Sequence, residues 1–232
     1  MPSVAKLINW FSPEQAKHIA EGNGGWLPPH PRESIKWSYA SATTVTVGTD
    51  ATEYYNIGDK VRFKQNAGTY VYFVIISVAA TTIGLYGGSD YSVANQDITD
   101  IEISKSASPL GFPKYFNWSP TLGGFSGNPT NSSYTFQTIG RRCFVDVRQG
   151  SVGTSNGTTL TISAPITAAT LTNGQWGACA WAWADNSVAG TTAARADIST
   201  AASTINCYKD ISAAAWTAAN GKRISFTLGY PF

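Results

Sequence analysis

The segment Tyr70-Val71-Tyr72-Phe73-Val74-Ile75-Ile76 decides the fold class, because it is apolar without interruption and rich in aromatic and β-branched residues. A short apolar run of this composition predicts a central β-strand. The preceding segment, Lys60-Val61-Arg62-Phe63-Lys64, alternates polar and apolar residues and predicts a strand with one buried face. Asn66-Ala67-Gly68 provides a turn between the two strands.

Further strand signals lie on both sides of this pair. Thr43–Val47 is β-branched throughout, Thr81–Tyr86 is a further candidate strand that ends before Gly87-Gly88, and Ile98–Ser104 alternates polar and apolar residues. Four or five short strands within about 70 residues are typical of a small barrel or sandwich. Residues 37–104 are therefore predicted to form a small β domain.

Residues 1–36 differ from this pattern. Ser12-Pro13-Glu14-Gln15 combines a capping serine with a proline suited to the first turn, and predicts a short helix that ends near Gly22. A proline-rich extended stretch follows. Four large apolar residues have no regular element of their own to cover them, and we interpret them either as a cap over the first β domain or as an arm that docks onto a neighbouring subunit: Trp10, Phe11, Trp26 and Leu27.

The second half of the chain is also predicted to be β. Residues 105–133 are rich in Gly, Pro and aromatic residues, which indicates an ordered linker. Residues 134–232 carry many short strand signals separated by Gly-rich turns and predict a jelly-roll-like β-sandwich. Its expected strands are Tyr134–Ile139, Cys143–Val147, Thr159–Ser163, Trp176–Ala184, Ala194–Ile198, Thr204–Tyr208 and Arg223–Tyr230.

The composition of the chain narrows the classes of partner that we expect. Only 13% of the 232 residues are charged and the net charge is +2, so there is no basic stripe of the kind that nucleic-acid binders carry. We expect no nucleic-acid partner. We also expect no membrane insertion, because no apolar run approaches about 18 residues. Cys143, Cys179 and Cys207 share no metal-type spacing and are interpreted as buried free thiols, with one disulfide as the alternative.

Catalytic constellations are missing from the sequence. The two histidines, His18 and His30, lie near no other metal ligand or nucleophile, and no phosphate-binding loop or nucleophile elbow is present. The acidic residues fall mostly beside turns, whereas glycan hydrolysis needs a carboxylate pair. We predict a protein with no enzymatic activity, no cofactor and no metal.

Tryptophan is abundant, with 8 residues in the chain. Indole rings in a β protein either stack on sugar rings or fill a core or subunit interface. The second half supplies four candidates for a ligand platform or an interface: Trp176, Trp181, Trp183 and Trp216.

Several motifs together resemble virion proteins of tailed bacteriophages. The segment Tyr55–Gln65 with its Gly-Asp-Lys turn, followed by Thr69–Val74 and Thr81–Tyr86, is similar to a small β module of those proteins. Gly140–Val145, Gly157–Pro165 and Gly221–Tyr230 resemble their trimeric fibre-type jelly rolls. The resemblance implies a virion location, after synthesis in the host bacterial cytoplasm, and a homotrimer without catalytic residues.

The sequence therefore predicts a structural component of a bacteriophage virion, displayed on the particle surface as a fibre, receptor-binding or capsid decoration protein. Residues 1–36 would attach it to other virion proteins, and a host-surface glycan is a candidate ligand. The alternative is a carbohydrate-binding β-sandwich module and, with less support, a glycan depolymerase.

Overall fold

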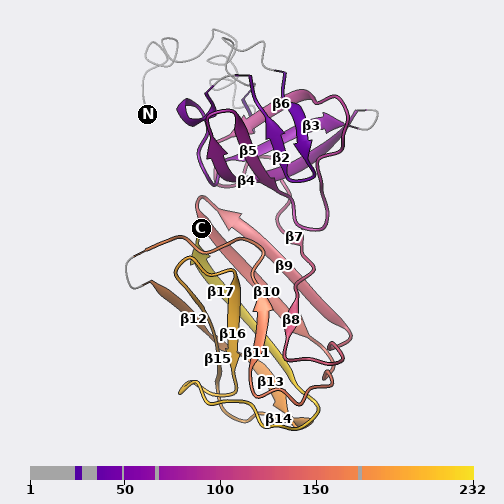
Figure 1. The fold of residues 1–232 in the computed structure, drawn as a ribbon, viewed down its shortest axis with the longest axis vertical. Helices are drawn as coiled ribbons and strands as arrows, with labels where there is room; N and C mark the ends of the chain where they lie inside the picture. The colour runs from indigo at the N-terminus through magenta and orange to yellow at the C-terminus, as the bar shows by residue number, and fades with distance from the viewer. Residues whose placement is uncertain (1–23, 28–35, 49, 66–67, 172–173) are drawn as a thin grey trace. The chain divides into compact units, whose positions relative to one another are not determined.

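The computed structural model describes residues 24–27, 36–48, 50–65, 68–171 and 174–232. The chain divides into two compact units. The first is Met1–Lys114 with Thr138–Arg141, and the second is Tyr115–Gln137 with Arg142–Phe232. Strands β1 to β17 make the fold all-β, as predicted, and the one helical element among the described residues is a 3-10 turn at Ala51–Glu53 (Figure 1). The helix expected from Ser12 lies outside the described residues.

The first unit is one antiparallel sheet that curls on itself (Figure 1), in the order β1-β2-β5-β4-β3-β6. Its strands are β1 (Ser38–Ser41), β2 (Thr44–Thr46), β3 (Lys60–Gln65), β4 (Thr69–Ala79), β5 (Thr82–Tyr86) and β6 (Thr99–Ser104). The apolar run at 70–76 lies within β4, which pairs with β3 on one side and β5 on the other. The prediction of a central strand is therefore confirmed.

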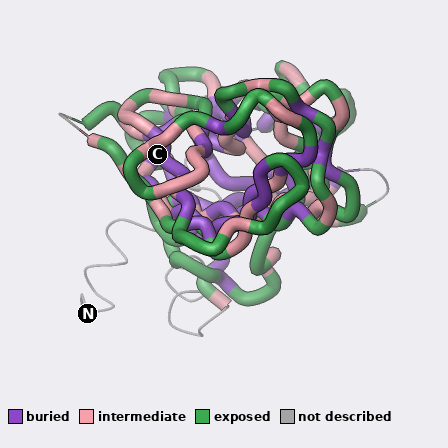
Figure 2. Tube along the Cα trace, turned by 90° about the horizontal axis from the view of Figure 1, so that it is seen from below, coloured by how far each residue is buried: buried purple, intermediate pink, exposed green. Residues whose placement is uncertain are grey.

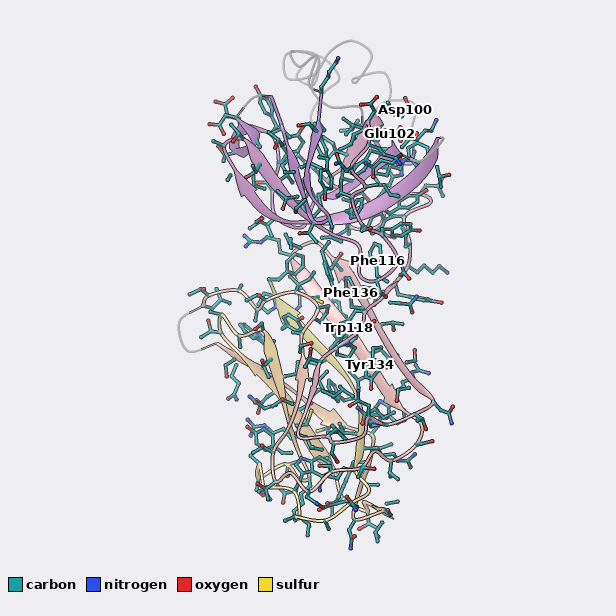
Figure 3. The ribbon with its side chains drawn as sticks, turned by 45° about the vertical axis from the view of Figure 1, so that its right-hand side comes forward. Asp100, Glu102, Phe116, Trp118, Tyr134 and Phe136 are labelled. Carbon is teal, nitrogen blue, oxygen red and sulfur yellow. The ribbon has the colours of Figure 1, made fainter. Side chains whose placement is uncertain are left out.

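The core of the first unit follows from the alternation in β3. Val61 and Phe63 point inward and are fully buried, with Phe63 stacked on Phe73 of β4 at a ring separation of 5.2 Å. Arg62 and Lys64 occupy the opposite face and pair with Glu102 and Asp100 of β6. The alternating sequence thus separates an aromatic core from an ion-paired outer face, and Figure 3 labels the two acidic residues.

The second unit contains two antiparallel sheets and is sandwich-like. One sheet has the order β14-β13-β17-β10-β9-β7 and the other β12-β15-β16-β11-β8. The first sheet comprises β7 (Phe116–Asn117), β9 (Ser132–Ile139), β10 (Arg142–Gln149), β13 (Ala182–Asp185), β14 (Val188–Ala189) and β17 (Arg223–Pro231). The second comprises β8 (Leu122–Gly123), β11 (Leu160–Ser163), β12 (Gln175–Ala180), β15 (Ala194–Ser199) and β16 (Thr204–Tyr208).

The core of the second unit comes from alternate residues of these strands. In β10 the buried apolar positions are Cys143, Val145 and Val147, and in β17 Phe226 and Leu228 are among the buried ones. Figure 2 colours the chain by burial, and buried and exposed stretches alternate along it. The two-residue period of the sequence therefore places the apolar side chains in the core.

One expected strand was wrong. The segment Trp176–Ala184 is not one strand but two, because the chain leaves one sheet after Ala180 and enters the other at Ala182. β12 pairs with β15, whereas β13 pairs with β17. Trp181 lies at this corner and its backbone N–H donates to the carbonyl of Ser225. The uniform alternation of small and large residues did not reveal the break.

The stretch expected as a linker, residues 105–133, contributes to the second unit from Tyr115 onward. Its strands β7 and β8 pair with β9 and β11. Phe116 stacks on Phe136 at 5.3 Å, and Trp118 meets Tyr134 edge-on at 5.7 Å, so that two successive aromatic pairs fix β7 against β9 (Figure 3). Phe116 and Trp118 therefore belong to the packing of the sandwich, whereas Phe112 of the same segment packs against Trp26 and Tyr72 of the first unit.

The three cysteines are free thiols, as expected, but only Cys143 and Cys207 are buried while Cys179 is exposed. Burial, with a further contribution from the Asp197 carboxylate, raises the pKa of the Cys207 thiol. Because the thiolate is the reactive form, we expect a thiol reagent to modify one cysteine in the native protein and three after denaturation. Quantitative labelling followed by peptide mapping checks this, and native labelling at Cys207 would contradict it.

Candidate functional site

The four candidate tryptophans differ in burial. Trp216 is buried at 2% exposure, Trp176 and Trp183 are half-buried, and Trp181 is exposed at 62%. Only Trp183 and Trp216 contact each other, edge to face with ring centroids 6.0 Å apart. The four rings therefore do not form one shared platform, but two of them mark one place in the second unit.

That place is an open hollow of about 420 Å³, which we call the Asp185 pocket. It lies beside the β13–β14 hairpin. Its walls are Trp183 and Asp185 of β13, residues 188–192 of the hairpin's second arm, and Lys209 with Asp210, which follow β16. The pocket thus brings together residues from two sheets that are far apart in the sequence.

Trp183 forms a rigid wall of the Asp185 pocket. The indole N–H of Trp183 donates to the carbonyl of Thr192 at 2.7 Å, and the backbone N–H of Gly190 donates to the carbonyl of Trp183 at 3.0 Å. A Cβ atom at Gly190 would lie 1.8 Å from Cε2 of the indole, so the ring lies directly against the glycine backbone. Trp216 packs edge to face with the same ring, so contacts with Gly190 and Trp216 together hold Trp183 in place.

Asp185 is the chemically distinctive group of the pocket. Its side chain is only 9% exposed, and Oδ2 accepts hydrogen bonds from the backbone N–H and the hydroxyl of Thr217 at 3.0 and 2.6 Å. Oδ1 is buried and has no hydrogen-bond partner within the part of the chain that the structure describes. A buried carboxylate oxygen without a donor is unusual in proteins.

Two lysines flank this carboxylate. Lys209 Nζ lies 3.9 Å from Oδ2 and is 32% exposed on the pocket wall, whereas Lys222 Nζ lies 4.0 Å from Oδ1 and is completely buried. Lys222 donates instead to the carbonyls of Ser155, at 2.9 Å, and Ala219. The charge of Asp185 is therefore compensated by lysines on both sides without a direct hydrogen bond.

We predict that Gly190→Ala destabilises the second unit by about 1–3 kcal/mol, the range for inserting a group into a filled space. The new methyl group would collide with the indole of Trp183. Gly177→Ala is the matched control, because a Cβ there would meet its nearest neighbours at 3.6 Å, an ordinary contact. Urea unfolding of both variants measures the difference, and equal stability of the two would contradict the packing.

The apolar residues expected in an N-terminal arm are described only in part. Trp10 and Phe11 lie outside the described residues. Trp26 is buried against its own unit, with the guanidinium of Arg62 4.4 Å from its ring and its N–H donating to the carbonyl of Leu110. Leu27 exchanges two backbone hydrogen bonds with Ile103 of β6. For Trp26 and Leu27 the structure therefore has the arrangement of a cap over the first domain.

No group of three or more His, Cys, Asp or Glu residues that could hold a metal ion occurs in residues 24–27, 36–48, 50–65, 68–171 and 174–232. Within the same ranges, no helix is long and apolar enough to cross a membrane. Compared with known proteins, the chain matches no family model, no curated protein and no solved structure. The functional argument therefore rests on the residues themselves.

Sequence reasoning pointed to Trp183 and Trp216 but missed Asp185, Lys209 and Gly190. The sequence predicts that most acidic residues lie beside turns, and Asp185 does end β13 immediately before the β13–β14 turn. Only the three-dimensional return of the chain after β16 places Lys209 beside it. A local signal was available in Trp183 and Gly190, which flank a short hairpin.

Proposed function

We propose that this protein is a structural component of a bacteriophage virion, displayed on the particle surface, which acts by assembly and surface recognition and not by catalysis. The observation that carries the proposal is the similarity of Tyr55–Gln65, Gly140–Val145 and Gly221–Tyr230 to virion β modules. These motifs occupy strands or adjoining turns in two successive β units, an arrangement consistent with that role.

The surface of the second unit supports a role in assembly. Large apolar side chains are exposed on it, among them Leu171, Trp181, Val188 and Ile211. Low overall charge favours burial of such a surface against other proteins, because charged residues are depleted from interface cores. We propose that copies of the chain assemble as a homotrimer, and that other virion proteins are further partners.

Immunogold electron microscopy of purified particles tests the virion location, with an antibody raised against residues 134–232. Label on the particles is the expected result. Label on tail fibres or the tail tip would indicate receptor binding, and label over the head would indicate capsid decoration. Particles that carry no label, from a preparation in which an antibody to a known capsid protein binds, would overturn the proposal.

We predict a solution mass three times the chain mass of 24.7 kDa for the purified protein. Sedimentation equilibrium at micromolar concentration measures it. Trp181→Glu places a charge on an exposed apolar residue of the proposed assembly surface and is expected to weaken association. A monomeric wild-type protein would contradict the homotrimer, whatever the result for the variant.

A further inference from the structure

We propose that the side chains of Lys222 and Asp185 condense in the folded second unit to form a covalent amide bond, with release of one water molecule. This inference goes beyond the proposed function, since it concerns a modification of the chain by its own residues and does not depend on where the protein is displayed. The bond joins the end of β13 to the residue that precedes β17.

The pairing of β13 with β17 places the two residues opposite each other. Ala184 pairs with Arg223 at the end of this antiparallel ladder, so that the next residues along the two strands are Asp185 and Lys222. The backbone of Lys222 is fixed as well, because it exchanges two hydrogen bonds with Gly153 at 2.8 and 3.0 Å. Nζ of Lys222 lies 4.0 Å from Oδ1 of Asp185. The fold therefore holds the amine and the carboxyl group together before any reaction.

Both groups are withdrawn from water. The Lys222 side chain is completely buried and the Asp185 side chain is 9% exposed, and Oδ1 has no hydrogen-bond donor among the residues that the structure describes. Buried charges are costly unless they are paired and hydrogen-bonded. Transfer of one proton from Nζ to Oδ1 removes both charges. It leaves a neutral amine beside a carboxylic acid, which are the two forms that condensation requires.

The hydrogen bonds of Lys222 suit a neutral amine. Its Nζ donates to the carbonyls of Ser155, at 2.9 Å, and Ala219. A neutral amine has two N–H groups and one lone pair. The two carbonyls accept both N–H groups, so the lone pair remains for bond formation. Removal from water activates a lysine amine as a nucleophile, and Lys222 meets this condition.

Asp185 has the donors that a carboxyl group under attack needs. The backbone N–H and the hydroxyl of Thr217 both donate to Oδ2, at 3.0 and 2.6 Å. Negative charge develops on this oxygen when Nζ attacks Cγ, and two fixed donors stabilise it as in an oxyanion hole. The Nζ–Cγ bond forms and the Cγ–Oδ1 bond breaks, and Oδ1 leaves as water with two protons that both come from Nζ. The step needs no oxidant, reductant or further reactant.

Lys209 provides an internal comparison. Its Nζ lies 3.9 Å from Oδ2 of the same carboxylate, but its side chain is 32% exposed. Water hydrates this ammonium group and keeps it protonated, and the oxygen nearest to it already accepts two hydrogen bonds from Thr217. We therefore expect Lys222 to react and Lys209 to remain an ordinary lysine.

Mass spectrometry of the purified full-length protein tests the proposal. We expect the native protein, kept for several days at neutral pH, to be lighter by the mass of one water molecule than its sequence requires. Trypsin should then release residues 149–195 and 210–223 as one branched peptide, because the modified Lys222 is no longer a cleavage site. Native protein that retains its full mass, or that loses water only at another position, would overturn the inference.

Two lysine variants assign the reacting amine. Lys209→Met should lose the water molecule as the wild-type protein does, whereas Lys222→Met should retain its full mass. Because Lys222→Met also removes a buried charge, the branched peptide of the wild-type protein decides the question if this variant does not fold. A branched peptide that contains Lys209 in place of Lys222, or loss of water by folded Lys222→Met, would contradict the assignment.

Discussion

Replacing Trp216 with alanine is expected to lower the free energy of unfolding of the second unit by about 3–5 kcal/mol, the range for deleting a large buried aromatic side chain. Trp216 is 2% exposed, it packs edge to face with Trp183, and its N–H donates to the carbonyl of Cys207 at 2.7 Å. The substitution therefore leaves a cavity, a carbonyl without its donor and a loosened pocket wall. Urea unfolding followed by far-ultraviolet circular dichroism measures the effect.

Two further variants separate these contributions. Trp216→Phe retains most of the ring and loses the hydrogen bond, and we expect it to cost about 1–3 kcal/mol. Trp181→Ala removes the same side chain from a site that is 62% exposed and should change the stability of an isolated protomer by less than about 0.5 kcal/mol. If Trp216→Ala and Trp181→Ala cost the same, the packing of Trp216 described above is wrong.

Lys222→Met is expected to destabilise the second unit by about 3–5 kcal/mol, because removing one partner leaves an opposite charge buried without compensation. Lys222 is completely buried, donates to the carbonyls of Ser155 and Ala219, and lies 4.0 Å from Asp185. Methionine fills nearly the same volume, so the loss comes from the ammonium group and not from a cavity. Urea unfolding again provides the measurement.

Lys209→Met is the matched control. Lys209 lies 3.9 Å from the same carboxylate but is 32% exposed, and exposed ion pairs contribute at most about 1 kcal/mol. Adding Asp185→Asn to Lys222→Met should recover part of the lost stability, since the uncompensated charge is then removed. A Lys222→Met protein as stable as the Lys209→Met protein would show that the buried ammonium does not contribute to the fold.

The sequence predicted the strands whose signal lies in a run of consecutive residues. β4 was recognised from its apolar run, β3 from its alternation, and β10, β11, β15, β16 and β17 from short periodic segments between turns. The break at Trp181 was missed because the side chains alternate without interruption while the hydrogen-bonding partner changes from β15 to β17. β7 and β8 were missed because two-residue strands have no periodicity, and aromatic pairing across strands holds β7 in place.

The candidate site was predicted less well than the fold. An indole ring in a sequence does not reveal what it packs against, and only the structure shows that Trp183 lies against Gly190 and Trp216. Asp185 and Lys209 are separated by 24 positions and meet because β16 ends beside β13. Their combination depends on the path of the chain and leaves no local pattern.

The pairing of Leu27 with Ile103 has a consequence for solubility. β6 is the last strand of its sheet, and the unpaired backbone of a last strand is a template for addition of strands from other molecules. The backbone N–H and the carbonyl of Ile103 are both hydrogen-bonded to Leu27, and the ring of Trp26 lies against the guanidinium of Arg62 on the neighbouring strand β3. A chain that lacks residues 1–27 would leave the backbone of β6 uncovered. We expect such a chain to aggregate as its concentration rises, which light scattering detects.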